Sequence, residues 1–361
     1  QKKRAEDIIV TLEKWREKAP LDEQSELVYI LGYAYHMLGI ALDELGESSA
    51  RIGKGPGDCW EKAEDLLGRA TSSEAQRGRV DVGISRAVRA LYLGYCDEAI
   101  SIFEELLSKA VLSPQRAMLV KNNLAVAYLD RREPSDINRA IELVEQNINQ
   151  AQENNDTDAW IWAIEIRLKA LKEEIDTSDE TGVPTLLEQA GYLYNTSWGL
   201  ICPGALVGAG PPPVEASKDL VELHRVMAEI YLTAGKVGEA EEHITFILKS
   251  QWHKGYEEGD ILVTLAMFDQ QKGELEKAQT RLELAHKCFG EEQRGGMVIE
   301  TDLKLAALQN DWPGAQAILK EAKAIAQRLR SKRLVGRVDN LRKDLRKKLS
   351  SYVPTQPIVS K

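Results

Sequence analysis

Cysteine is scarce in this chain, and its scarcity excludes two classes of protein. Only four of the 361 residues are cysteines, and they lie far apart without forming a CxxC pair. This excludes a disulfide-stapled scaffold and a metal site built from clustered cysteines. It indicates the cytoplasm or another reducing intracellular compartment. Long apolar runs are missing too, since none approaches the ~20 residues of a membrane-spanning helix, and we expect no membrane partner.

Recognisable catalytic motifs are also absent. The five histidines form no HExxH pattern, and no Gly-x-Ser-x-Gly elbow occurs. Gly53-Lys54-Gly55 lacks the spacing and the preceding strand of a phosphate-binding loop. We therefore predict a protein that is not an enzyme, with no catalytic, cofactor-binding or metal-binding residues and no cofactor. We expect His243, beside Glu241 and Glu242, on a solvated helix face.

The overall composition is that of a folded, acidic protein. Hydrophobic residues make up 43% and charged residues 29%, and the formal net charge is −10. An acidic body repels phosphate backbones, which disfavours general nucleic-acid binding. It is compatible with a basic protein client, although ordinary solubility explains the charge equally well.

Apolar residues recur at helical spacing along nearly the whole chain. One such stripe consists of Leu220, Leu223, Met227, Ile230 and Tyr231. No convincing alternating strand pattern is present. Glycine and proline interrupt the helical stretches at intervals, so the sequence predicts an all-α protein.

Small residues recur at a regular interval in every second predicted helix. Ala240, Ala278 and Ala315 are 38 and 37 residues apart, and an earlier series consists of Ala63, Ala99 and Ala140. A large apolar residue follows each alanine four positions later, as with Leu67, Phe103, Val144, Ile244, Leu282 and Leu319. Gly94, Gly235 and Gly273 each lie five residues before an aligned alanine, where a turn between two helices is expected.

This pattern resembles the tetratricopeptide repeat (TPR), most closely from Val221 to about Lys254. In such a repeat the small residues let two antiparallel helices approach, and neighbouring pairs stack because no pair buries its apolar face alone. The resemblance implies an all-α, right-handed α-solenoid of about six to seven TPR-like helix pairs with a C-terminal capping helix. The irregular, long spacing also resembles the TPR sensor and scaffold solenoids of signalling regulators.

The breaks suggest a division of the chain into five segments. We expect TPR-like repeats over 1–197 and 215–325, separated by a Pro/Gly-rich joint at 198–214. A basic capping helix is expected over 326–349, followed by a flexible tail over 350–361. The unit from Asp158 to Ser197 is degenerate, because it does not show the repeat pattern clearly.

The TPR resemblance implies a ligand site in a concave groove lined by the first helix of each pair. The positions carried over are Asn122, Val126, Leu129, Glu222, Arg225, Glu229, Leu232, Val263, Met267 and Gln270. This mixture of apolar and polar side chains suits a partner helix or an extended peptide. Each of these residues could instead pack against a neighbouring repeat. We also expect His224 to face this groove as an ordinary polar contact.

One specialised TPR activity does not carry over. TPR domains that clamp the C-terminal carboxylate of heat-shock chaperones need cations at positions that here hold Tyr29, Glu222 and Val226. The resemblance therefore excludes that clamp.

The C-terminal region is strongly basic. Eleven Lys or Arg and two Asp lie between Lys323 and Lys348, which we interpret as one long helix. It would cap the last repeat with a solvated basic face. Its cations could also form an electrostatic dock for an acidic partner, RNA or the chain's own acidic body, through Arg333, Arg337, Arg342 and Lys347.

The sequence thus predicts a protein-binding scaffold, adaptor or regulatory subunit that works within a multiprotein complex. Two alternatives remain open at this point. One is an acidic assembly chaperone for a basic client protein. The other is a regulatory factor that contacts nucleic acid, which we expect only through the basic C-terminal helix.

Overall fold

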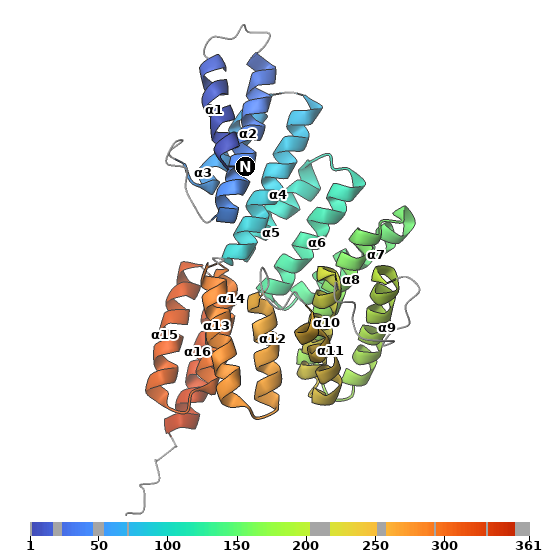
Figure 1. Ribbon diagram of the computed structural model, residues 1–361, viewed down its shortest axis with the longest axis vertical. Coiled ribbons are helices and arrows are strands. Elements are labelled where there is room, and N and C mark those ends of the chain that lie inside the picture. Colours follow the sequence, from blue (N-terminus) through green and yellow to red (C-terminus); the bar gives the residue numbers. More distant parts are fainter. Residues whose placement is uncertain are drawn as a thin grey trace, which may run out of the picture. The chain divides into compact units, whose positions relative to one another are not determined.

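A computed structural model shows an all-α protein built from stacked helix pairs (Figure 1). It describes residues 2–16, 24–45, 54–70, 72–202, 217–250, 258–291, 294–329 and 331–350. Over these residues all of the regular elements are α-helices, and they form the TPR-like solenoid that the repeat pattern predicted. The chain divides into two compact units, one of residues 1–91 with 96–127 and the other of 92–95 with 128–361.

The first unit is formed by the N-terminal helices. They are α1 (Lys2–Arg16), α2 (Gln24–Leu45), α3 (Pro56–Arg69), α4 (Ser73–Leu93, as far as residue 91), α5 (Cys96–Lys109) and most of α6 (Pro114–Arg131). Leu31, Trp60 and Leu67 lie in a core that α1, α2 and α3 share. The close packing of α2 on α3 depends on Gly39, since a Cβ there would lie 2.4 Å from the Trp60 indole nitrogen.

The second unit contains the remaining helices. They are α7 (Asp136–Asn154), α8 (Thr157–Thr177), α9 (Val183–Ile201), α10 (Lys218–Thr233), α11 (Val237–Lys249), α12 (Glu258–Gln271), α13 (Leu275–Glu291), α14 (Gly295–Leu308), α15 (Trp312–Arg328) and α16 (Lys332–Ser350). Helices α8, α10, α12 and α14 are the first members of their pairs, and α8, α10 and α12 pack against one another in sequence. We call these four the first helices of this unit.

The aligned alanines lie at the helix contacts, as the repeat pattern predicted. All six of them are completely buried, and the large residues that follow each one after four positions are at most 2% exposed. Gly235 and Gly273 adopt φ angles of +72° and +80° at the turns between helices. Because residues with a Cβ rarely adopt that conformation, glycine is the residue that suits these two turns.

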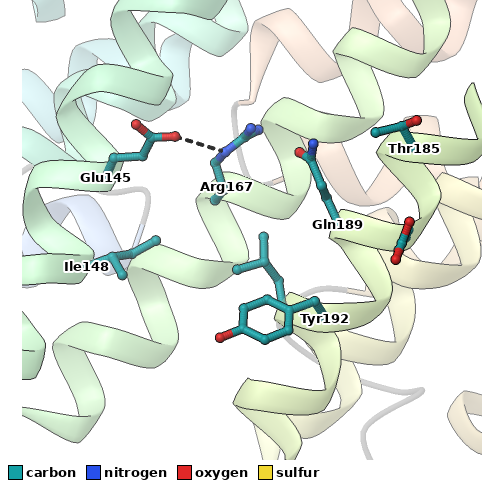
Figure 2. Close-up of a pocket in the computed structure, with 8 residues that line it drawn as sticks. Glu145, Ile148, Arg167, Thr185, Gln189 and Tyr192 are labelled. Atoms are coloured by element: carbon teal, nitrogen blue, oxygen red, sulfur yellow. Dashed lines mark ion pairs between the residues drawn. The ribbon is translucent and has the colours of Figure 1, made fainter. Parts of the chain in front are cut away.

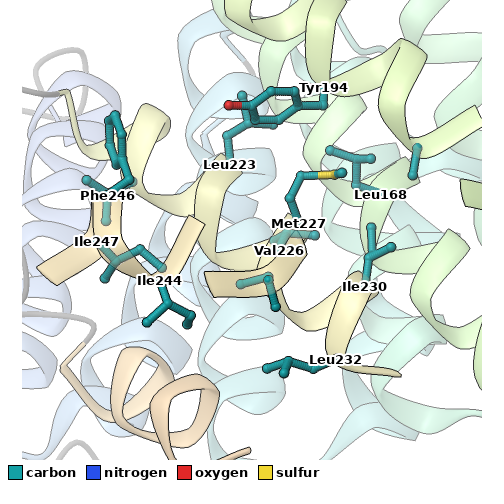
Figure 3. Close-up of a cluster of buried hydrophobic side chains, with 14 of the residues drawn as sticks. Leu168, Tyr194, Leu223, Val226, Met227, Ile230, Leu232, Ile244, Phe246 and Ile247 are labelled. Carbon is teal, nitrogen blue, oxygen red and sulfur yellow. The ribbon is translucent and has the colours of Figure 1, made fainter. Parts of the chain in front are cut away.

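Helix α10 occupies the centre of the largest core of the second unit (Figure 3). Leu223, Met227 and Ile230 are buried together with Leu168 of α8 and Ile244 of α11. Residues on nearly every side of α10 are buried, because α8, α9, α11 and α12 all pack against it. Its polar side chains are therefore held in position by the surrounding core.

The degenerate fourth unit is a complete helix pair, α8 and α9. Ala190 occupies the small position of α9, and Tyr194 is the large residue four positions later. Fifty residues separate Ala190 from Ala240, because residues 202–217 intervene between α9 and α10. The other aligned alanines are closer together, so their interval did not identify Ala190 as a repeat position.

One predicted boundary of the joint differs from that of the structure. Helix α9 runs on to Ile201, where the sequence placed the start of the joint, because Trp198 is buried and its carbonyl accepts a hydrogen bond from the Cys202 N–H. Residues 203–214 of that joint, and the tail from residue 351, lie outside the described residues.

The basic region is not one long helix. It is divided between α15 and α16, and the Ser331 hydroxyl accepts a hydrogen bond from the Leu334 N–H at the start of α16. The apolar face of α16 packs on α14 and α15, with Val338 and Leu345 buried. It therefore covers the end of the helix array, as predicted for a capping helix.

Candidate functional site

Three of the residues predicted to line a groove form a charged group on α10. Glu222, Arg225 and Glu229 follow one another at intervals of three and four residues, which places them on one helix face. The Arg225 guanidinium donates to both carboxylates, and its Nη2 lies 2.6 Å from Glu222 Oε1. All three side chains are at least four-fifths buried, so their charges depend on these contacts.

Helices α8 and α12 complete this group with residues that the sequence reasoning missed. Lys169 Nζ lies 2.9 Å from Glu222 Oε1, and Lys172 Nζ lies 2.7 Å from Glu229 Oε2. From α12, the Thr264 hydroxyl donates to Glu229 Oε1 over 2.7 Å. Burial alone would raise the pKa of Glu229, but Lys172 and Arg225 outweigh it and lower that pKa to about 2. Glu229 is therefore a carboxylate at neutral pH.

A second charged group lies on α14. Glu300 accepts hydrogen bonds from Arg333 and Arg337, which both come from α16. Lys304 lies one turn after Glu300 on the same helix and is close enough to Glu229 and Lys172 for both to act on its pKa. We call this set the first-helix charged cluster: Lys169, Lys172, Glu222, Arg225, Glu229, Thr264, Glu300 and Lys304.

The other predicted groove residues do not join this cluster. Most of the apolar ones pack against neighbouring helices: Leu129, Leu232 and Val263 are buried, and Met267 is half-buried in the core. Gln270 is exposed at the end of α12. Asn122 is buried and Val126 half-buried, and both belong to the first unit.

The predicted electrostatic dock is likewise divided. Arg333 and Arg337 contact Glu300 of the same chain, so these two cations serve the chain's own acidic body. Arg342 and Lys347 are exposed on α16.

The repeat register could have identified Lys172 and Lys304. They lie 18 residues before Ala190 and 11 residues before Ala315, which are the intervals that separate Glu222 and Glu229 from Ala240. The register was weak or missing for these two pairs, and it gives no signal for Lys169. The contacts of Lys169 and Lys172 with Glu222 and Glu229 could not be read from spacing alone.

The expectations for His243 and His224 were wrong. His243 is buried, while Glu241 and Glu242 beside it are exposed. The Nδ1 atoms of His224 and His243 lie 2.9 Å apart, and His224 stacks on Phe246 with their ring centroids 3.6 Å apart. Burial lowers the pKa of both imidazoles, so one neutral ring donates to the other. Both side chains therefore lie in the contact between α10 and α11 and not in a groove.

A shallow hollow of about 450 Å³ lies between α7, α8 and α9 (Figure 2). Ile148 and Leu193 give it an apolar part, and Tyr192 is exposed beside them. Arg167 at its edge already interacts with Glu174 at 2.8 Å and with Glu145 at 3.8 Å. Its one cation is therefore already neutralised, which leaves this hollow less suited to a charged ligand than the first-helix cluster.

Among the described residues, no group of three or more His, Cys, Asp or Glu side chains could hold a metal ion. Within the same residues, no helix is long and apolar enough to cross a membrane.

The fold has counterparts among solved structures. A Rap protein complexed with Competence and Sporulation Factor matches 96% of this chain over 99% of its own length, with 11% sequence identity and a TM-score of 0.54. A signal transduction ATPase with numerous domains (STAND) from Pyrococcus horikoshii, which has a tetratricopeptide repeat sensor, matches 94% of the chain with 16% identity and a TM-score of 0.43. The chain spans half the length of that STAND protein.

Comparison by sequence gives no further assignment, since no protein-family model and no curated protein matches the chain. The match to the Rap protein shows the fold alone, so the chain's own residues carry the argument for its function.

Proposed function

We propose that this chain is a non-enzymatic sensor or regulatory subunit that binds a segment of a partner protein, or a peptide, on the faces of α8, α10, α12 and α14 that carry the first-helix charged cluster. The observation that carries the proposal is this cluster itself. It gathers ionised side chains from successive first helices, and several remain accessible, with Lys169 37% and Lys172 25% exposed.

The stability of the helix array does not account for these charges. Removing ion pairs from water has a desolvation cost that their mutual attraction only partly recovers, and well-packed apolar residues often serve a core equally well. The alanines and large apolar residues already hold the helix pairs together. A face with both signs of charge is instead suited to the polar backbone and charged side chains of a polypeptide ligand.

The fold supports the same class of function. The solved Rap protein, which shares this fold over nearly its full length, is complexed with Competence and Sporulation Factor. From the Rap protein to this chain we carry over only the general role of a TPR-like helix array that receives a signal or a partner. Contact with nucleic acid is not part of the proposal, because Arg333 and Arg337 are already engaged by Glu300.

Capture of partners from native lysate tests this proposal when wild type is compared with a Lys169→Ala, Lys172→Ala double variant. Arg225 still donates hydrogen bonds to both Glu222 and Glu229 in the variant, and the Thr264 hydroxyl still donates to Glu229, so each carboxylate keeps a partner and we expect the fold to be kept. We expect a partner that the wild type retains at high salt to be lost from the variant. Hydrogen exchange on the wild-type complex should be slowed in α8, α10 and α12.

The matched control removes the same two charges from second helices, in a Lys249→Ala, Lys320→Ala double variant whose altered residues are exposed on α11 and α15. It should capture the partner as the wild type does. Equal capture by both double variants, or slowed exchange confined to α11, α13 and α15, would contradict the proposal.

A further inference from the structure

Lys304 differs from the other cations of the first-helix charged cluster because it has no counter-ion. Among the described residues it makes no ion pair and no hydrogen bond, whereas Lys169, Lys172 and Arg225 each contact a carboxylate. Its side chain is only partly exposed, on a helix that packs between α13 and α15. A partly buried ammonium without a partner is costly, so its presence here calls for a reason.

Both carboxylates near Lys304 are already occupied. Glu300, one turn earlier on α14, accepts from Arg333 and Arg337. Glu229 accepts from Lys172, Arg225 and Thr264. Both oxygens of Glu229 therefore have partners, and two guanidinium groups already share Oε1 of Glu300. Burial, together with the charges of Lys172 and Arg337, accordingly lowers the pKa of Lys304 although these two carboxylates act in the opposite direction.

The immediate surroundings of Lys304 therefore have an excess of positive charge. Lys172 and Arg225 both contact Glu229, and Arg333 and Arg337 both contact Glu300, so cations outnumber these two carboxylates even before Lys304 is counted. An added carboxylate would reduce this excess. Lysine and arginine bind carboxylate oxygens through charge-assisted hydrogen bonds, which are about twice as strong as neutral ones.

We propose that Lys304, flanked by Lys172 and Arg337, binds a single carboxylate group of the ligand that the first-helix charged cluster receives. This inference rests on the proposed function. The carboxylate can come from the C-terminus of a peptide or from an Asp or Glu side chain. In either case it fixes the register of the ligand along the first helices, because Lys304 lies at the α14 end of the cluster.

Three mixtures of N-acetylated random hexapeptides distinguish the two sources. The first lacks Asp and Glu and has free C-termini, the second has the same sequences with amidated C-termini, and the third contains Asp and Glu with amidated C-termini. Each is incubated with the full chain, and retained peptides are identified by ultrafiltration and mass spectrometry. Wild type is compared with Lys304→Met, which keeps the length of the side chain, and with Lys343→Met, which removes an exposed cation from α16.

We expect wild type to retain the first or the third mixture at least fivefold more than the second, and Lys304→Met to lose that preference while Lys343→Met keeps it. Preference for the first mixture identifies a C-terminal carboxylate, and preference for the third identifies an acidic side chain. Peptides that bind wild type and Lys304→Met equally would overturn the carboxylate site and leave the proposed function standing. Retention of no mixture would count against both.

Thermal unfolding of the same variants separates a binding role from a structural one. If Lys304 serves a ligand, Lys304→Met removes an uncompensated cation and the midpoint stays the same or rises. A midpoint clearly below that of Lys343→Met would show that Lys304 stabilises the fold, and it would overturn the inference.

Discussion

At the scale of single residues, the buried histidine pair makes the stability of the second unit depend on pH. His224 and His243 share a hydrogen bond between their Nδ1 atoms, and the Tyr194 hydroxyl lies 3.3 Å from His224 Nε2. Burial lowers the pKa of His243 to about 4. In the unfolded chain the same side chain takes up a proton near pH 6.5.

The direction of the effect follows from these two values. Below pH 6.5 the unfolded chain binds a proton that the folded chain does not bind until about pH 4, so the free energy of unfolding decreases as the pH falls between them. From pH 7 to pH 5 we expect His243 to account for a loss of about 2 kcal/mol. Denaturant unfolding at both pH values should show that His243→Gln loses about that much less than wild type. Equal losses would show that His243 is not neutral in the fold.

At the scale of helices, close approach between members of a pair depends on residues without bulk. Gly39 of α2 faces the Trp60 indole of α3, and the indole is buried and cannot move away. Alanine is the better helix former by about 1 kcal/mol, so propensity alone favours its substitution for glycine.

At Gly39 the steric clash of an added Cβ with Trp60 should outweigh the higher helix propensity of alanine. We expect Gly39→Ala to lower the free energy of unfolding by about 2 kcal/mol, because overpacking of a tight core usually costs 1–3 kcal/mol. The matched control is Gly68→Ala near the end of α3, where an added Cβ meets nothing within 4 Å. It should be neutral or slightly stabilising. Equal effects of the two substitutions in urea unfolding would show that α2 and α3 do not approach this closely.

Most of the helices were predictable from the sequence, and the exceptions have physical causes. The interval between alanines identified the second helix of six pairs, because each such alanine must lie at a helix contact. It missed α9, since the residues between α9 and α10 lengthen the interval at Ala190. The break between α15 and α16 was also missed, because it contains neither glycine nor proline and depends on the Ser331 cap.

The candidate site was less predictable than the fold for a related reason. Position along α10 was enough to place Glu222, Arg225 and Glu229 on one face. Their partners Lys169 and Lys172 come from α8, and Lys304 comes from α14, so which charges meet depends on how the pairs stack. The burial of His243 likewise depended on Tyr194 of α9 and Tyr231 of α10 packing around it.

At the scale of the whole molecule, each of the two compact units has a hydrophobic core of its own. Leu67 is buried in the core of the first unit and Leu282 in a core of the second. Truncation of a buried leucine to alanine usually costs 2–5 kcal/mol. In helix arrays each element is stabilised mainly by its neighbours. We therefore expect the loss in free energy of unfolding to remain within the unit that carries the substitution.

Hydrogen exchange of two variants measures this separation. Leu67→Ala should accelerate exchange of the most protected amides in α2 and α3 and leave those of α12 and α13 unchanged. Leu282→Ala should have the reverse effect. If either variant accelerates exchange in both units to the same extent, the chain unfolds as one cooperative body.

The buried alanines at the repeat positions affect how proteins with this fold can be compared by sequence. In each pair close packing restricts the residue type at the small position, at the large apolar position that follows, at some turns, and at tight helix contacts such as Gly39. Elsewhere apolar or polar character is sufficient, so substitutions can accumulate while every helix is kept. The Rap protein illustrates the result, with 11% identity over 96% of this chain. For such proteins, the interval between small residues retains information about architecture after residue identity has lost it.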